Sequence, residues 1–361
     1  MEVNKRLAAI VVVIILIGAV AGYALFSLTE NEDTNSDVRI GYLVGDLHQL
    51  SRVVAMNATV GSGQTLMQKN HLNVSTPNPT GYGNGGQVMD AFAADLIDVG
   101  YLGAPPALLK NINAGINITI VAQVNNEGSS IIVKSYINTF QDLDQKVVAT
   151  PGVASIQHLL LMDLALENGM NLAQAGTNQA NTVYWTQIAP VNQKAALEAD
   201  TIQGAVGWEP YGSDSVLDGT AKVLNWSSEL LPGHPCCVIA VKTSFLNEHR
   251  DIVEKLLTAH VQANEWIESA MANPESPDHE LLFKMAEEFS NRNESVVANS
   301  LDHIILTYNI TPEFEDGLKQ FTQVMLDLDL ITEAKMLERG YSSVDDFVSK
   351  VVDDSIINGV K

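Results

Sequence analysis

The sequence predicts an α/β protein in which helices cover mostly parallel sheets. Short apolar segments typical of strands alternate with helical stretches from residue 38 to residue 241, the pattern of β–α–β units. After residue 241 the apolar spacing is almost entirely helical. Hydrophobic residues make up 46% of the 361-residue chain, so a large core can form, and the length suits two domains or one domain in two halves.

The elements follow from short apolar runs bounded by turn residues and from helical spacing between them. Strands are expected at residues 38–44, 72–75, 97–102, 116–124, 130–133, 147–149, 183–187, 201–206 and 238–241. Helices are expected at residues 51–60, 87–94, 105–114, 154–168 and 192–199.

The amino terminus predicts where the folded part works. Residues 7–28 carry no charged side chain and follow Lys5 and Arg6, and 22 residues are long enough to cross a membrane as a helix. An uncleaved anchor is favoured over a signal peptide cleaved after the Ala-Val-Ala pattern at residues 19–21, because the apolar run is longer than that of a usual signal peptide. Residues 29–36 are expected to form a tether, with the fold outside the cytoplasm.

The charge balance excludes one class of partner. The chain has 20 Lys and Arg against 43 Asp and Glu, a formal net charge of −23. An acidic surface of this kind repels phosphate backbones, so no nucleic-acid partner is expected.

A glycine-rich loop precedes one expected helix. Residues 81–86 satisfy G-x-G-x-x-G between a strand and a helix, as in dinucleotide-binding folds. However, Pro77 and Pro79 lengthen the connection, and Asp98 comes too early for the usual ribose-binding acid. The favoured interpretation is a loop that presents backbone N–H groups to a small ligand.

Two other strand ends carry candidate ligand-binding residues. Residues 150–155 lead into a helix whose first N–H groups can bind an oxygen, although Ser155 can also serve as a simple helix cap. Trp208 follows an expected strand at its carboxyl end, where ligands bind in open α/β sheets. Its indole is either a wall of the ligand site or part of the packing between lobes.

Recognisable enzyme motifs are absent, including G-x-S-x-G, the P-loop and H-E-x-x-H. His234, Cys236 and Cys237 form the one sequence cluster with metal-ligand chemistry, but no second His/Cys group has the spacing to complete a tetrahedral site. No metal is therefore expected, and two small thiols within a buried strand are favoured. The adjacent cysteines are not expected to form a disulfide with each other.

Five segments in order carry a family resemblance: VRIGYL (38–43), DVGYLGAPPAL (98–108), NNEGSSIIV (125–133), DLDQKVVATPG (142–152) and GWEPY (207–211). With them the chain resembles the substrate-binding proteins of ABC transporters in the nitrate/sulfonate/taurine group, which also contains thiamine-precursor binders. The resemblance runs from about residue 38 to residue 266.

The resemblance implies a type II periplasmic-binding-protein-like fold, in which two α/β lobes are joined by two crossing strands. Lobe 1 would comprise residues 37–128 and 240–361, and lobe 2 residues 129–239. The implied function is that of a monomeric, membrane-anchored extracytoplasmic receptor without cofactor or catalytic residues. It would close around a nitrate-, sulfonate- or taurine-type ligand and deliver it to an ABC permease and its ATPase.

Three alternatives remain open at this point. One is a receptor for a thiamine-precursor-like heteroaromatic stacked on Trp208, because few cations fall in the candidate loops. Another is an enzyme on the same scaffold that uses His234, Cys236 and Cys237. The third is a sensor or adhesion module held by its anchor. The family places the ligand between strand-end loops of both lobes, which here contain His48, Gln49, Gly86, Gln87, Leu102, Gly103, Ala104, Glu127, Ser129, Pro151, Ala154, Ser155, Trp208 and Glu209.

Overall fold

The computed structural model describes residues 36–60, 63–176 and 179–361. The chain divides into Met1–Ser36 and Asp37–Lys361, and the second unit contains the fold. The membrane helix expected at residues 7–28, and all but the last residue of the expected tether, lie outside the described residues. Within the described part, no helix combines the length and the apolar character needed to cross a membrane.

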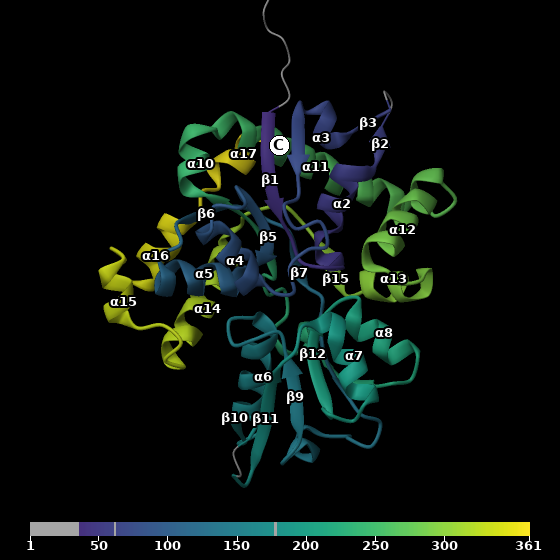
Figure 1. Ribbon diagram of the computed structural model, residues 1–361, viewed down its shortest axis with the longest axis vertical. Helices are drawn as coiled ribbons and strands as arrows, with labels where there is room; N and C mark the ends of the chain where they lie inside the picture. Colours follow the sequence, from purple (N-terminus) through teal and green to yellow (C-terminus); the bar gives the residue numbers. More distant parts are fainter. Residues whose placement is uncertain (1–35, 61–62, 177–178) are drawn as a thin grey trace, which may run out of the picture. The chain divides into compact units, whose positions relative to one another are not determined.

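Strands and helices alternate through the first two thirds of this unit, and helices dominate the rest (Figure 1). The strands are β1 (Ser36–Gly41), β2 (Thr59–Val60), β3 (Gln64–Thr65), β4 (Leu72–Ser75), β5 (Val99–Gly103), β6 (Ile118–Gln123), β7 (Asn125–Glu127), β8 (Ser129–Val133), β9 (Val147–Thr150), β10 (Asn171–Gln174), β11 (Thr182–Gln187), β12 (Gly204–Trp208), β13 (Lys222–Trp226), β14 (Cys237–Lys242) and β15 (Ile304–Leu306). The helices are η1 (Leu47–Gln49), α2 (Leu50–Asn57), α3 (Leu66–Lys69), α4 (Gly85–Ala93), α5 (Ala104–Ala114), η2 (Phe140–Leu143), α6 (Ile156–Glu167), α7 (Pro190–Glu198), α8 (Tyr211–Leu217), α9 (Ser227–Leu230), α10 (Thr243–Glu248), α11 (Arg250–Ala272), α12 (Pro277–Ser290), α13 (Glu294–Leu301), α14 (Pro312–Asp327), α15 (Glu333–Glu338), α16 (Val344–Val351) and α17 (Ser355–Val360).

The first lobe is a five-stranded sheet with the order β4-β1-β5-β14-β6, together with its covering helices. β1 and β5 are parallel, whereas β14 runs antiparallel to both β5 and β6. Every residue of β6 is buried, as expected for a strand whose sheet is covered on both faces. The helices that follow β14 return to this lobe, where α11 packs on α2 and α14 packs on α5.

The second lobe is a six-stranded sheet with the order β10-β11-β9-β12-β8-β13. β10, β11, β9 and β12 are parallel, and β8 runs antiparallel to β12 and β13. Successive side chains of a strand point to opposite faces, so Ile131 and Ile132 of β8 enter separate cores. Helices therefore cover both faces of this sheet.

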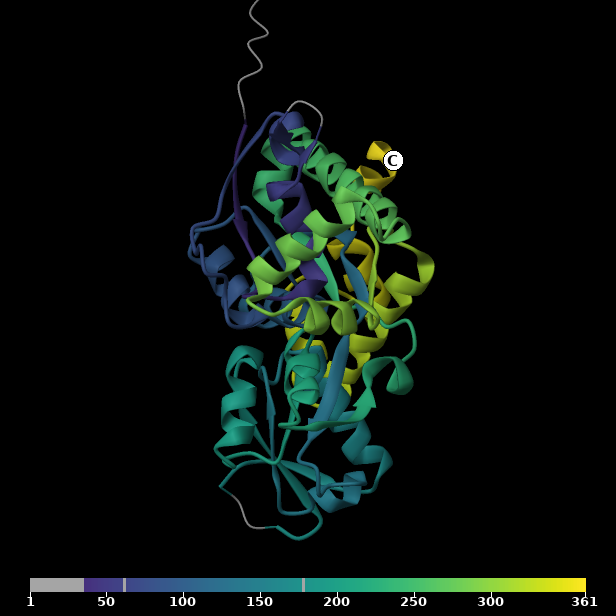
Figure 2. The same ribbon diagram turned by 90° about the vertical axis from the view of Figure 1, so that its right-hand side faces the viewer.

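Two segments connect the lobes, which lie one above the other in Figure 2, and a β-bridge holds these segments side by side. The first contains β7, and the second leads from α9 to β14. Asn126 forms a β-bridge with Pro235, and the Glu127 N–H donates to the His234 carbonyl at 3.1 Å. β14 begins at Cys237 and pairs within the first sheet, so residues 237–239 belong to that sheet.

The fold class predicted from the sequence is confirmed. Each expected strand overlaps an observed one, and the segment at residues 72–75 coincides with β4. The five expected helices correspond to α2, α4, α5, α6 and α7. The strands that went unpredicted are short or lie at sheet edges, as β10 and β13 do.

Candidate functional site

A narrow pocket of about 20 Å³ lies between the two lobes. Strand ends and helix starts of both lobes contribute to its wall, which consists of Leu43, Asp46, Gly85, Gly103, Pro106, Cys236 and Cys237 from the first lobe and Pro151, Ser155, Ile156, Gln157 and Trp208 from the second. Such a position, at the carboxyl ends of strands and between lobes, is where α/β proteins bind ligands. We call this space the inner pocket.

A wider pocket of about 280 Å³ shares Gly85, Pro106, Pro151 and Ser155 with the inner pocket. We call it the outer pocket. Its remaining wall consists of Asn84, Gly86, Gln87, Asp90, Lys110, Gly152, Val153, Ala154 and Gln187. The Lys110 ammonium forms an ion pair of 2.8 Å with Asp90, so both charges stand at this wall.

Two helices begin at the outer pocket, one from each lobe. The Asn84 side chain caps α4 by accepting from the Gln87 N–H at 3.0 Å, and Ser155 caps α6 by accepting from the His158 N–H at 3.2 Å. The first N–H groups of a helix have no partner within it, so both helix starts offer donors to a bound oxygen. A Cβ at Gly85 would lie 2.4 Å from Pro106, so a larger residue there would force α4 and α5 apart.

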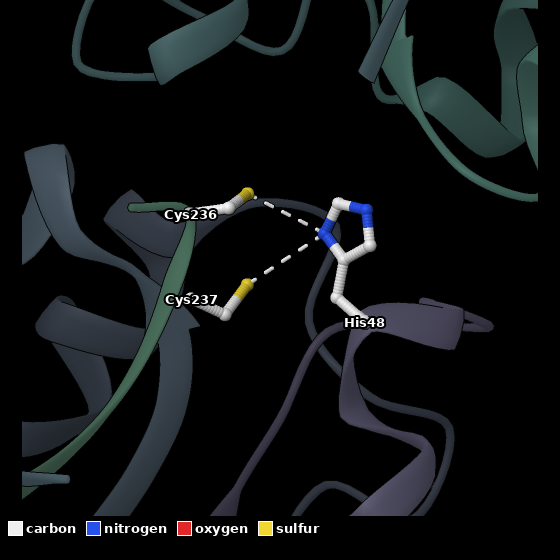
Figure 3. Close-up of side chains that lie close together, drawn as sticks. All are labelled: His48, Cys236 and Cys237. Carbon is white, nitrogen blue, oxygen red and sulfur yellow. Dashed lines mark hydrogen bonds between the residues drawn. The ribbon is translucent and has the colours of Figure 1, made fainter. Parts of the chain in front are cut away.

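Beside the inner pocket, His48 and the two cysteines converge (Figure 3). The Nδ1 atom of His48 lies 3.4 Å from the Cys236 sulfur and 3.9 Å from the Cys237 sulfur. The Asp46 carboxylate lies beside this group, with Oδ1 3.4 Å from the same Nδ1 and Oδ2 3.8 Å from the Cys237 sulfur. All four side chains are buried and both thiols are free.

The backbone of three segments holds this group in place. Asp46 caps η1 by accepting from the His48 N–H at 3.1 Å. The other ring nitrogen of His48, Nε2, lies 2.7 Å from the Gly128 carbonyl oxygen, to which it donates. Asn125 anchors the cysteines, because its carbonyl oxygen accepts from the Cys236 N–H and its side-chain oxygen from the Cys237 N–H.

Burial and mutual interaction shift the protonation of all four groups. Burial raises the pKa of Asp46 to about 6. Burial alone would lower the pKa of His48, but the Asp46 carboxylate and the Cys236 thiolate raise it to about 10. The Cys237 thiol donates to Cys236, which lowers the pKa of Cys236 well below its usual value and raises that of Cys237. The group therefore favours a thiolate at Cys236 next to a cationic His48.

The structure places about half of the sequence-derived candidates at a pocket wall. Trp208 and Gly103 line the inner pocket, and Pro151 and Ser155 line both pockets. The outer pocket also contains Gly86, Gln87 and Ala154. His48 lies next to the inner pocket through its contacts with the cysteines.

The remaining candidates line neither pocket. Gln49 donates to the Asp46 carboxylate at 3.0 Å, and Ser129 accepts from Gln157 at 2.9 Å. Glu209 is buried and accepts from the Ser213 N–H and the Ser300 hydroxyl. Glu127 accepts from the Gly233 N–H, while Leu102 and Ala104 are fully buried in the core.

The indole ring of Trp208 is packed against its neighbours, but its N–H group lacks a hydrogen-bond partner. It is 4% exposed and makes an edge-to-face contact with Tyr211, with ring centroids 6.5 Å apart. Its Nε1–H has no hydrogen-bond partner among the described residues. Buried donors usually have a partner, so a ligand oxygen in the inner pocket would satisfy this one.

Sequence reasoning missed Asp46 and Gln157 as wall residues and did not associate His48 with the cysteines. It instead grouped His234 with Cys236, but the His234 ring Nδ1 lies 3.0 Å from the Pro235 carbonyl oxygen. The order of the strands explains why His48 meets the cysteines. β1 and β14 both flank β5, and the end of β1 and the start of β14 lie at the same edge of the sheet. Residues after β1 and before β14 are therefore brought together.

Comparison with known proteins places this architecture in a family. The model of the NMT1-like family matches residues 49–277, and the chain belongs to this family. The nitrate/nitrite binding protein NrtA from Nostoc sp. (strain PCC 7120 / SAG 25.82 / UTEX 2576) is 21% identical over 184 residues, which are 48% of this chain and 42% of NrtA. The match thus spans less than half the length of that curated relative.

Solved structures share the fold across nearly the whole chain. The periplasmic nitrate-binding protein NrtA from Synechocystis PCC 6803 superposes with a TM-score of 0.70 at 13% identity, covering 91% of this chain and 88% of that one. The alkanesulfonate-binding protein SsuA from Xanthomonas axonopodis pv. citri, bound to MOPS, gives 0.68 at 19% identity, covering 89% and 99%. The ligand-binding component of an ABC-type import system from Staphylococcus aureus, with zinc bound, gives 0.69 at 18% identity, covering 90% and 99%. The two-lobed periplasmic-binding-protein-like fold and the resemblance to nitrate and sulfonate binders are thereby confirmed.

Proposed function

We propose that this chain is an extracytoplasmic solute receptor that closes its two lobes around a small ligand and delivers it to an ABC importer. One observation carries the proposal: both lobes contribute strand ends and helix starts to the same pair of pockets. Two connecting segments side by side form a suitable hinge, because rotation about them opens or closes the pockets while each sheet stays intact. The partners would be a permease and its ATPase.

The ligand class that the outer pocket favours is a small oxyanion such as a sulfonate or nitrate. The starts of α4 and α6 face one pocket from opposite lobes, and helix N-termini bind anionic oxygens through their free N–H groups. Lys110 adds a cationic side chain at the same wall, where it is paired with the Asp90 carboxylate. The guanidinium of Arg52 is directed elsewhere, because it packs 3.9 Å from the ring centroid of Tyr42.

Titration calorimetry on the full-length protein tests this proposal with nitrate, taurine, an alkanesulfonate and a pyrimidine. We expect one of the anions to bind at one per chain, and Lys110→Gln to weaken that binding by about 2- to 5-fold, as for a partly exposed charge interaction. Lys319→Gln is the matched control, because Lys319 forms a similar surface ion pair with Asp316 and lines neither pocket. Binding of the pyrimidine alone, with Lys110→Gln equal to wild type, would refute the oxyanion class.

A further inference from the structure

We propose that His48, Cys236 and Cys237 bind one zinc-class ion at the inner pocket, in a tetrahedral site whose fourth position takes a water or a ligand oxygen. Two thiolates and an imidazole form a donor set typical of zinc and unsuited to magnesium or calcium, which take oxygen ligands. The inference goes beyond the proposed receptor function, because it requires no anion and no transporter.

The spacing of the donors fits one central ion. Zinc lies about 2.3 Å from sulfur and about 2.0–2.1 Å from nitrogen, so tetrahedral angles require about 3.6 Å between sulfur and nitrogen. His48 Nδ1 lies 3.4 and 3.9 Å from the two sulfurs, and the three ligand atoms lie within 4.8 Å of one another. Asp46 contacts two of these ligands through different oxygens, Oδ1 at 3.4 Å from Nδ1 and Oδ2 at 3.8 Å from the Cys237 sulfur, so it supports the site from outside the ligand set.

The imidazole is also oriented as a metal ligand is. Metal-binding histidines usually donate the second ring N–H to a carbonyl or carboxylate, which fixes the ring and leaves the first nitrogen for the metal. Here Nε2 donates to the Gly128 carbonyl at 2.7 Å, and Nδ1 is directed toward both sulfurs (Figure 3). Gln49 donates to the Asp46 carboxylate and so holds the acid that lies beside His48 Nδ1.

The inner pocket gives the ion a way in and suits its size. Cys236 and Cys237 both line this space, so their sulfur atoms are not enclosed within the core of one lobe. A volume of about 20 Å³ holds little more than one water-sized occupant. In this arrangement of the lobes, an ion fits beside the thiols, whereas an organic substrate for a thiolate nucleophile does not.

Cobalt spectroscopy on the reduced, metal-free full-length protein tests the inference. Tetrahedral Co²⁺ with thiolate ligands shows strong visible d–d bands and a sulfur-to-cobalt charge-transfer band. The chain has 2 cysteines, so a charge-transfer band reports on Cys236 and Cys237 alone. We expect saturation at one Co²⁺ per chain and full displacement by one Zn²⁺. A weak octahedral spectrum without charge transfer would overturn the proposal, whatever the behaviour of any variant.

Variants then assign the ligands. Cys237→Ser and His48→Gln should each weaken Zn²⁺ binding by at least about 10- to 100-fold, the loss that even an outer partner of a ligand causes. His249→Gln, at an exposed histidine after α10, is the control and should bind as wild type does. Circular dichroism shows whether each variant folds. Folded variants of both ligands that bind zinc as tightly as wild type would overturn the assignment.

Anion calorimetry is a separate measurement, so a failure of the receptor proposal would not resemble a failure of the metal site.

Discussion

The Asp214 carboxylate on α8 of the second lobe forms an ion pair of 2.8 Å with Arg292, which follows α12 of the first lobe. A second contact between the lobes is the stack of Trp226 on His303, with ring centroids 3.5 Å apart and planes 16° from parallel. Neither contact touches the pocket walls. Both would break if the lobes moved apart, so they stabilise the arrangement of the lobes seen in this structure.

Trp226→Ala should therefore shift the protein toward an open form without altering the ligand site. A stacked ring pair contributes about 0.5–1.5 kcal/mol, so we expect a 2- to 10-fold rise in the Kd for ligand. Small-angle scattering should show a larger radius of gyration for the ligand-free variant. Trp185→Ala is a control within the second lobe, where Trp185 contacts His158. An unchanged Kd and radius for Trp226→Ala would show that this contact does not control closure.

Gly128→Ala should displace His48 and weaken zinc binding. Gly128 has φ of +82°, and a Cβ there would lie 2.3 Å from His48 Nε2. Gly219→Ala is a matched control, because Gly219 has φ of +83° and open space around it. Both variants should lose roughly 1 kcal/mol or more of stability from backbone strain, but Gly128→Ala should lose at least about 10-fold in zinc affinity as well. Equal zinc affinities in the two variants would contradict the role of the Gly128 contact.

Stability should fall in mild acid because two histidines are buried in neutral form. Burial lowers the pKa of His158 and of His260 to about 4. The unfolded chain then binds more protons than the folded one between about pH 6.5 and 4, so stability decreases as pH falls through that window. Each histidine accounts for on the order of 2–3 kcal/mol. Melting temperature against pH should decline less steeply for His260→Gln than for wild type or His249→Gln, and parallel curves would exclude His260 as a source.

Trp208→Phe should keep the apolar wall of the inner pocket but remove its unpaired donor. If a ligand oxygen accepts from Nε1, affinity should fall by about 2- to 10-fold, the worth of one hydrogen bond. Trp266→Phe on α11, away from both pockets, should bind as wild type does. Calorimetry with the anion that binds best measures the difference. No loss in Trp208→Phe would mean that the indole N–H does not contact the ligand.

The order of the main strands and helices could be predicted from the sequence because their apolar runs are continuous. β4 was located residue for residue, and β6 was extended by only a few residues. β10 and β13 were not predicted, because their side chains are partly exposed and such edge strands have no strong apolar pattern. Their place beside β11 and β8 depends on tertiary pairing.

Part of the candidate site was predicted and part was missed, because some of its residues are brought together only by the order of the strands. Candidates at the end of a single strand or the start of a single helix, such as Trp208 and Ser155, follow from local pattern and family resemblance. The metal group joins His48 to Cys236 across 188 residues, and no spacing rule spans that separation. Sheet order makes the contact, since β1 and β14 both lie next to β5. Local reasoning therefore selected His234, the nearest histidine in sequence.

The central claim is that the two lobes bind a small ligand and release it unaltered. The most direct test incubates the full-length protein with the anion that binds best, denatures it, and identifies the released molecules by mass spectrometry. The account predicts one unmodified ligand per chain, with none consumed. Recovery of a converted product, or no ligand retained above a Ser155→Ala, Lys110→Gln double variant, would contradict it.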